Sequence, residues 1–173
     1  METKDLAALI RDVPDFPKPG VIFKDITTLV SHPEAFKTTI DAFANRYRRK
    51  RVHKVLAIES RGFIFGGALA YSIGAGFPIV RKPGKLPYKT KSASYDLEYG
   101  TDTLEIHEDA VSPGERILLF DDVLATGGTM NAVAGLVENL GGKVVECAFV
   151  IELDFLKGRE KLVGRPIFSL IHF

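Results

Sequence analysis

Several features that mark specialised classes of protein are missing from this sequence of 173 residues. Cys147 is the single cysteine, which excludes an internal disulfide and fits a reducing compartment. The formal net charge is +1, which argues against nucleic acid as the main partner. No apolar run reaches the roughly 18 residues that cross a bilayer, and no signal peptide is visible. We therefore expect a soluble, cytoplasmic protein without a membrane partner.

Motifs of several common active sites are missing as well. The sequence has no Walker phosphate loop, no G-x-G-x-x-G dinucleotide fingerprint and no G-x-S-x-G nucleophile elbow. The histidines are scattered and do not have metal-ligand spacing with other histidines, cysteines or carboxylates. We therefore expect them to be structural, and we expect no metal site built from protein side chains. The four histidines are His32, His53, His107 and His172.

The most informative stretch present is Ile117–Thr129, where an apolar run leads into a glycine-rich loop. Its four opening residues fit a strand covered on both faces of a parallel sheet. Asp121 and Asp122 follow, then the loop Ala125–Thr129, then a helical pattern over residues 130–140. Glycines and a helix N-terminus let backbone N–H groups bind an anion. The carboxylates would repel phosphate but can accept hydrogen bonds from sugar hydroxyls. This arrangement predicts a sugar phosphate ligand such as ribose 5-phosphate; the alternative is a simple cap and turn.

A second strand, polar turn and helix occur earlier in the chain. Residues 55–58 form an apolar run, Glu59-Ser60-Arg61 follows, and a helical pattern covers residues 63–73. A second anion could bind there through backbone N–H groups and Arg61. The residues fit equally well a salt-bridged arginine near a helix start.

The segment after the apolar run 77–80 is long, polar and rich in lysine. Residues 92–100 and 102–106 alternate as the two arms of a hairpin do, and Lys82 and Lys85 precede them. The segment fits a surface hairpin with solvated lysines, or a lid that closes over a polyanion and excludes water.

The N-terminal region combines short elements with an exposed aromatic. An amphipathic helix is expected over residues 5–13, an irregular proline-containing segment over 15–20, and a short strand over 21–26. Phe23 could offer a flat face to a planar heterocycle, beside free backbone groups. It could also be a core residue of the strand.

The remaining segments complete a single α/β domain over residues 1–173. A helix is expected over 33–47, with a basic run at 46–51 that fits either a solvated face or a nucleic-acid contact. Further apolar strands are expected over 143–150 and 167–171. Alternating strands and helices predict a parallel sheet with helices on both faces.

The Ile117–Thr129 stretch resembles the phosphoribosyl pyrophosphate (PRPP) signature of the type I phosphoribosyltransferases. Nearly the whole chain resembles the adenine phosphoribosyltransferases within that family. The resemblance implies the family fold, with a small hood at roughly residues 1–30 and a mobile hairpin lid at roughly 81–106. It implies transfer of the 5-phosphoribosyl group from PRPP to adenine, giving AMP and pyrophosphate in purine salvage. It also implies Mg²⁺ as cofactor and a homodimer.

The same resemblance assigns roles to individual residues. It implies that Asp121 and Asp122 hold the ribose hydroxyls and that Glu98 handles a proton at the base. It implies a catalytic set that adds Arg61 to these three, and a cis peptide bond between Glu59 and Ser60. The implied 5-phosphate site is Ala125, Thr126, Gly127, Gly128 and Thr129; the pyrophosphate site is Glu59, Ser60, Arg61, Lys82, Lys85 and Tyr99; and the adenine site is Ile22, Phe23, Lys24 and Leu153.

Two other functions are weighed against this one. A transferase for a 6-oxopurine such as hypoxanthine, guanine or xanthine would want a donor to O6, usually a lysine, and residues 151–155 offer none that is obvious. A non-catalytic PRPP-binding regulator would be expected to carry a DNA-binding domain, for which 173 residues leave no room.

Overall fold

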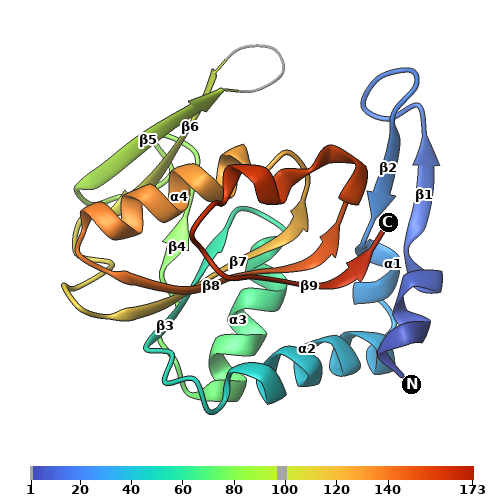
Figure 1. Cartoon of the computed structure of the whole chain (residues 1–173), viewed down its shortest axis with the longest axis horizontal. Helices are drawn as coiled ribbons and strands as arrows, with labels where there is room; N and C mark the ends of the chain where they lie inside the picture. Colours follow the sequence, from blue (N-terminus) through green and yellow to red (C-terminus); the bar gives the residue numbers. More distant parts are fainter. Residues whose placement is uncertain (1, 97–100) are drawn as a thin grey trace.

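The computed structural model describes residues 2–96 and 101–173. Its centre is a five-stranded sheet of order β4-β3-β7-β8-β9, in which every neighbouring pair is parallel (Figure 1). This confirms the predicted parallel α/β sheet. The strands are β3 (Lys54–Ile58), β4 (Ile79–Val80), β7 (Arg116–Leu124), β8 (Lys143–Glu152) and β9 (Ile167–His172).

Helices cover both faces of the sheet, as the sequence predicted. The helices α2 (Pro33–Tyr47) and α3 (Gly62–Ile73) pack on one face and α4 (Gly128–Asn139) on the other. Alternate residues of β7 divide between the two cores, since Leu118 and Phe120 belong to the first and their neighbours to the second. The four apolar residues in a row are therefore all buried.

The N-terminal segment differs from the prediction. A 3-10 helix, η1 (Thr3–Leu9), replaces the first part of the expected helix 5–13. The rest of that helix is wrong, because β1 (Arg11–Pro14) pairs antiparallel with the predicted strand, β2 (Ile22–Asp25). Cross-strand ion pairs from Arg11 to Asp25 and from Lys24 to Asp12 favour the hairpin over a helix. A short helix, α1 (Thr27–Val30), follows β2.

The predicted lysine-rich hairpin is also present. Its arms are β5 (Thr90–Asp96) and β6 (Thr101–His107), which pair antiparallel. Leu104 and Ile106 anchor it in the core shared with α4. Figure 1 shows this hairpin and the β1–β2 hairpin projecting from the same side of the molecule, at its two ends. The strand expected at residues 77–80 is reduced to β4, because Pro78 lacks a backbone N–H for the ladder.

Two short 3-10 turns complete the chain, η2 (Asp154–Leu156) and η3 (Gly158–Lys161). None of the helices in the described part of the chain is both long and apolar enough to span a membrane. Cys147 is fully buried, and burial raises the pKa of its thiol to about 12. It is therefore a small core residue and not a reactive thiol.

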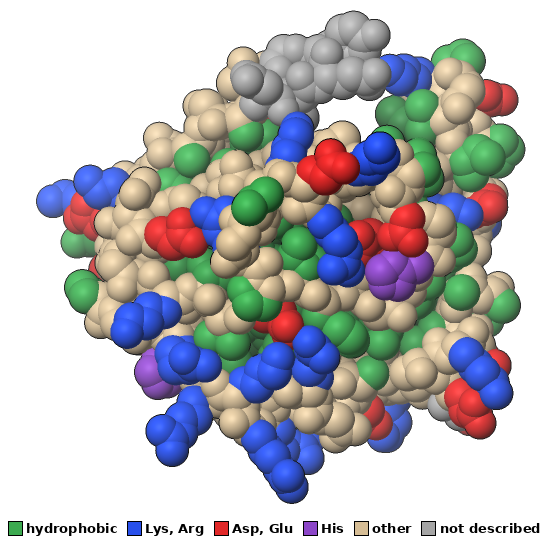
Figure 2. Space-filling model, viewed as in Figure 1, with side chains coloured by type: hydrophobic (Ala, Val, Ile, Leu, Met, Phe, Trp, Pro, Cys, Tyr) green, Lys and Arg blue, Asp and Glu red, His purple; other side chains and the backbone are tan. Residues whose placement is uncertain are grey.

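The basic run after α2 serves partly to neutralise a buried acid. In Figure 2, lysine and arginine side chains gather at the lower edge of the molecule, near the end of α2. Arg46 donates two hydrogen bonds of 2.8 Å to the Glu146 carboxylate, and Lys50 donates a third of 3.1 Å. Glu146 is 5% exposed, so these partners offset its loss of hydration. These two side chains of the run therefore pair with a buried acid while they remain about a third exposed.

We expect Arg46→Ala to lower the free energy of unfolding by about 2–3 kcal/mol, because it leaves a buried carboxylate short of partners. Arg49→Ala is the matched control, since this neighbouring arginine is exposed, and it should change stability by less than about 0.5 kcal/mol. Urea unfolding at pH 7 measures both. Equal effects of the two substitutions would show that Glu146 does not need Arg46.

The contact between Arg46 and Glu146 also predicts that the stability of the protein depends on pH. Burial alone would raise the pKa of Glu146, but the hydrogen bonds from its cationic partners outweigh burial and lower it to about 2. A depressed carboxyl pKa adds stability above the ordinary value of 4.5, and this is lost as pH falls toward 2. Urea midpoints measured between pH 6 and 3 should therefore fall more steeply for the parent protein than for Glu146→Gln. Parallel curves would contradict this assignment.

Candidate active site

A cavity of about 540 Å³ opens at the carboxyl ends of β3 and β7. Its walls come from the hood strand β2, the turn after β3, the end of β7 and the β5–β6 hairpin. Ligands bind at this edge of open α/β sheets. The sequence-predicted residues that line it are Ile22, Phe23, Lys24, Glu59, Ser60, Arg61, Lys82, Asp121, Asp122, Ala125, Thr129 and Leu153.

The other predicted site residues lie elsewhere. Thr126 and Gly127 line a smaller cavity of about 70 Å³, which shares Ala125 and Thr129 with the larger one. Gly128 is the first residue of α4. The structure does not place Lys85 on the wall of either cavity; it is exposed in the segment before β5. Glu98 and Tyr99 lie outside the described residues.

The two carboxylates of the acidic pair have different surroundings: Asp122 is paired with an arginine, and Asp121 is packed closely against Gly62. Asp122 is 8% exposed at its side chain and accepts a hydrogen bond from Arg61 Nε. Burial, together with the charge of Asp122, raises the pKa of Asp121. Gly62 begins α3 against Asp121, because a Cβ there would lie 3.1 Å from the Asp121 Oδ1. The pair therefore presents acceptor oxygens to the cavity while one arginine balances its charge.

The loop after β7 is shaped for close approach of backbone groups. Gly127 is the N-cap of α4 with φ +79°, a left-handed conformation that favours glycine, and it offers no side chain to cap the helix. The first N–H groups of a 12-residue helix thus face the loop without a side-chain cap from any described residue. This is the geometry expected of a phosphate site.

A second glycine holds that loop from behind. Gly158 of η3 packs backbone against backbone, so that a Cβ on it would lie 2.3 Å from the Ala125 carbonyl oxygen. A Cβ on Gly127 would in turn lie 2.3 Å from the Gly158 carbonyl oxygen. The loop and η3 therefore fit together only because both positions lack a side chain.

The turn after β3 has the cis Glu59–Ser60 peptide bond that the family resemblance implied. The Glu59 carboxylate accepts a hydrogen bond of 2.7 Å from Arg81 Nε, so its side chain is occupied within the protein. Arg61 reaches Asp122 from this turn, and its guanidinium lies 5.2 Å from the centre of the Phe23 ring. The turn thus connects the acidic pair to the hood.

The hood is tied to the body through Lys24. Its ammonium lies 2.6 Å from the Asp12 carboxylate and 4.0 Å from the centre of the Phe173 ring. Its charge is therefore satisfied within the protein, and the backbone of β2 is what remains for a ligand. Phe23 meets the edge of Phe16 at 5.2 Å between ring centres.

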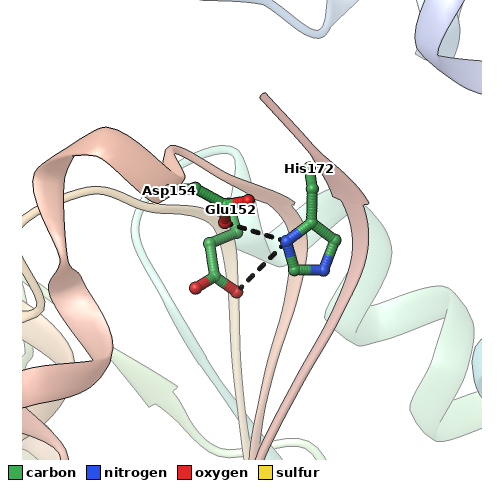
Figure 3. Close-up of side chains that lie close together, drawn as sticks. All are labelled: Glu152, Asp154 and His172. Carbon is green, nitrogen blue, oxygen red and sulfur yellow. Dashed lines mark hydrogen bonds and ion pairs between the residues drawn. The ribbon is translucent and has the colours of Figure 1, made fainter.

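Leu153 follows β8 directly, and its neighbours in the sequence carry two carboxylates that Figure 3 shows close to His172. The His172 Nδ1 is 2.9 Å from the Asp154 carboxylate and 3.9 Å from that of Glu152. Among the described residues, these three could hold a metal ion by spacing alone. Glu152, however, already accepts hydrogen bonds of 2.6 and 2.7 Å from Arg159 and 2.5 Å from Ser169. The cluster is a polar network on either side of Leu153 in which Arg159 and Ser169 already occupy Glu152, and sequence spacing gave no sign of it.

Sequence reasoning missed several residues of the cavity wall. The most polar of them is Tyr95 of β5; the others are Val21, Ile58, Leu104, Val123 and Leu156. Tyr95 stood within the predicted hairpin, but its register against β6 decides which way it points. Leu156 stood beyond the last predicted site residue, in a turn that periodicity does not reveal.

Comparison with known proteins agrees with this geometry. The family model described as "Phosphoribosyl transferase domain" matches residues 25–164. An adenine phosphoribosyltransferase of Trichlorobacter lovleyi is 59% identical over 170 residues, covering 98% of this chain and 99% of that protein. The crystal structure of adenine phosphoribosyltransferase from Thermoanaerobacter pseudethanolicus superposes with a TM-score of 0.96 at 51% identity, covering 99% of each chain. The enzyme of that name from Saccharomyces cerevisiae, solved with an imino-altritol bisphosphate and adenine, gives 0.92 at 40% identity and 97% coverage of each chain.

Proposed function

This chain belongs to the phosphoribosyl transferase family, and on that premise we propose that it transfers the 5-phosphoribosyl group of PRPP to adenine, giving AMP and pyrophosphate. The observation that carries the proposal is one cavity lined by the hood strand, the acidic pair, the turn after β3 and the two ends of the loop after β7. The relatives named adenine phosphoribosyltransferase match over nearly the whole chain, which supports the same reaction. We place this activity in purine salvage in the cytoplasm.

The 5-phosphate of PRPP binds the loop Ala125–Thr129 in this proposal. Uncapped N–H groups at the start of α4 and the two threonine hydroxyls supply the donors. Asp121 and Asp122 accept hydrogen bonds from the ribose hydroxyls. Sugar and phosphate are thereby fixed at two points, which sets the direction in which C1′ faces the base.

The pyrophosphate group lies against the cis turn and the hairpin. The backbone at Glu59–Ser60, the Arg61 guanidinium and the Lys82 ammonium face the same cavity. Lys85 and Tyr99 complete the proposed set on the strength of the family resemblance. These groups neutralise negative charge that grows on pyrophosphate as its bond to C1′ breaks.

The residues of the cavity fit a Mg²⁺ ion whose ligands come mainly from PRPP. It prefers oxygen ligands and usually retains water when it binds phosphates. The carboxylates on the cavity wall are few, and Asp122 is already bonded to Arg61, so the protein does not form a closed cage. When bound, Mg²⁺ would neutralise phosphate charge and so make pyrophosphate a better leaving group.

The chemical step needs no covalent nucleophile. C1′ becomes oxocarbenium-like as pyrophosphate departs, and the acidic pair lies where it can stabilise that positive charge. The hairpin excludes water that would otherwise attack the sugar. Glu98 is the proposed proton-handling residue at the base, because it matches the acidic residue of the family's catalytic loop.

Adenine fits the hood better than a 6-oxopurine. The base packs between Phe23 and Leu153, with Ile22 beside it, and its edge meets the backbone of β2 near Lys24. Because the Lys24 ammonium is held by Asp12 and Phe173, it is not offered to a purine O6. The adjacent Arg61 already serves Asp122. Specificity therefore rests on backbone groups and shape.

A panel of purines tests the proposal. The protein is incubated with PRPP, Mg²⁺ and adenine, hypoxanthine, guanine or xanthine, and the nucleotides are separated by chromatography. We expect AMP from adenine and no product from the other bases. Product from hypoxanthine alone would refute the hood assignment, and tight PRPP binding without turnover of any base would favour the non-catalytic regulator.

We further propose that the protein is a homodimer that joins through α3. Ile64 and Tyr71 are 43% and 91% exposed, and they lie seven residues apart on one helix face. Phe77, 37% exposed, packs beside this helix against Phe63. A second copy of the chain would cover these apolar side chains.

We expect Ile64→Glu to convert a dimer into a monomer, because it places a charge in the centre of the proposed interface. Val163→Glu is the matched control, as Val163 is 81% exposed and follows η3 instead. Sedimentation equilibrium of both variants and the parent at micromolar concentration decides the matter. A parent protein that sediments as a monomer would refute the proposed dimer.

A further inference from the structure

Two side chains without a role so far, Tyr95 and Asp102, meet near the end of the β5–β6 ladder that is farthest from Thr90 and His107. They are direct partners in the antiparallel ladder. The Tyr95 hydroxyl donates to the Asp102 carboxylate at 3.2 Å. The Asp102 side chain is only 21% exposed, so its charge needs partners inside the protein.

The principal partner of Asp102 is Lys82. The Lys82 ammonium donates to the Oδ2 that also accepts from Tyr95, while Oδ1 accepts from the Thr103 backbone N–H at 2.9 Å. The hydrogen bond to Asp102 raises the pKa of Lys82 and so favours its charged form. Lys82 is still 51% exposed and lines the cavity. The carboxylate therefore occupies one of three N–H donors and leaves the others for a ligand.

Tyr95 connects this ion pair to the other end of the cavity. Burial raises the pKa of its phenol, and the nearby Thr129 side chain opposes that rise. Thr129 belongs to the proposed 5-phosphate loop, and Tyr95 and Thr129 both line the cavity. The phenol thus bonds the acid that holds the lysine for one phosphate group of PRPP, and it shares the cavity wall with the loop proposed to take the other.

We propose that Asp102 and Tyr95 are positioning residues that hold the Lys82 ammonium over the cavity for the pyrophosphate group of PRPP. The inference rests on the proposed function, which supplies that ligand. A free lysine loses much rotamer freedom when it binds an anion, whereas a lysine already ordered by a carboxylate loses less. Because the pair is half exposed at Lys82, it adds little to folding, so its removal acts mainly on binding.

The test measures KM for PRPP and for adenine separately in Asp102→Asn, Tyr95→Phe, Lys82→Met and the Asp102→Asn/Lys82→Met double variant. We expect Asp102→Asn to raise KM for PRPP about fivefold and to leave KM for adenine unchanged. Tyr95→Phe should raise KM for PRPP by only about twofold, because Lys82 still pairs with the Asp102 carboxylate. In the double variant Asp102→Asn should add nothing, since it acts through the lysine that is gone.

Asp109→Asn is the matched control, because Asp109 is an exposed carboxylate in the turn that follows β6. Thermal melting confirms that every variant is folded. Three results would overturn the inference: additive effects in the double variant, equal rises in KM for PRPP and for adenine, or a lowered KM for PRPP. A lowered KM for PRPP would mean that Asp102 competes with pyrophosphate. Calorimetric titration with PRPP and Mg²⁺ distinguishes failure of the proposed function from failure of this inference. A parent protein that does not bind PRPP refutes the proposed function, whereas equal binding by parent and variants refutes this inference alone.

Discussion

Replacing Asp122 with asparagine is expected to reduce kcat/KM about 100-fold or more while the protein stays folded. The side chain is 8% exposed at the floor of the cavity and bonded to Arg61, and asparagine keeps its size. The substitution removes the negative charge that would stabilise a cationic sugar, and it exchanges one ribose acceptor for a donor. Initial rates of AMP formation at varied PRPP concentration measure the loss.

The control for charge alone is Asp41→Asn, which removes an exposed carboxylate from α2 far along the chain from the cavity wall. It should leave kcat/KM within about twofold. If Asp122→Asn kept more than a tenth of the parent activity, the acidic pair would not have the role assigned here, and the cavity would need another group near C1′.

Gly158→Ala is expected to abolish measurable PRPP binding at concentrations that saturate the parent protein. The new Cβ would lie 2.3 Å from the Ala125 carbonyl oxygen, where only backbone movement can relieve the clash. That movement displaces the proposed phosphate loop, and overpacking of this kind costs about 1–3 kcal/mol in stability. Calorimetric titration with PRPP and thermal melting measure the two effects.

Gly135→Ala provides the matched control, because Gly135 lies within α4 and a Cβ there meets nothing within 4 Å. It should stabilise the helix by up to about 1 kcal/mol and leave PRPP binding intact. Normal PRPP affinity in Gly158→Ala would show that the loop does not depend on η3.

The parts of the fold that sequence predicted well are those with a strong local pattern. The helix over residues 33–47 was predicted with its observed bounds, because Pro33 suits a first turn and its apolar residues follow the helical period. The strand at residues 117–120 was identified from four buried residues in a row. The N-terminal helix failed past Leu9, because cross-strand partners at Lys24 and Asp25 decide the structure there, and no local pattern shows them.

The candidate site divides in the same way. Its loop, acidic pair and the turn after β3 could be proposed because each is a contiguous motif, and all three contribute residues to one cavity. The cis bond in that turn was expected from the family resemblance alone. Tyr95 and Gly158 were missed because their importance depends on approach between distant segments: the phenol faces Asp102 across a hairpin, and the glycine packs on the Ala125 carbonyl. The network of His172 with Glu152 and Asp154 likewise exists only after β8 and β9 are paired.

A crystal structure of the protein with bound AMP tests the account most directly. We expect the phosphate on the N–H groups of residues 126–129, the ribose hydroxyls on Asp121 and Asp122, and the adenine ring between Phe23 and Leu153. Because Arg61 now lies over Phe23, its guanidinium should move away from that ring as the base enters. A phosphate bound instead at the Glu59–Arg61 turn, or a base outside the hood, would contradict the assignment of the cavity.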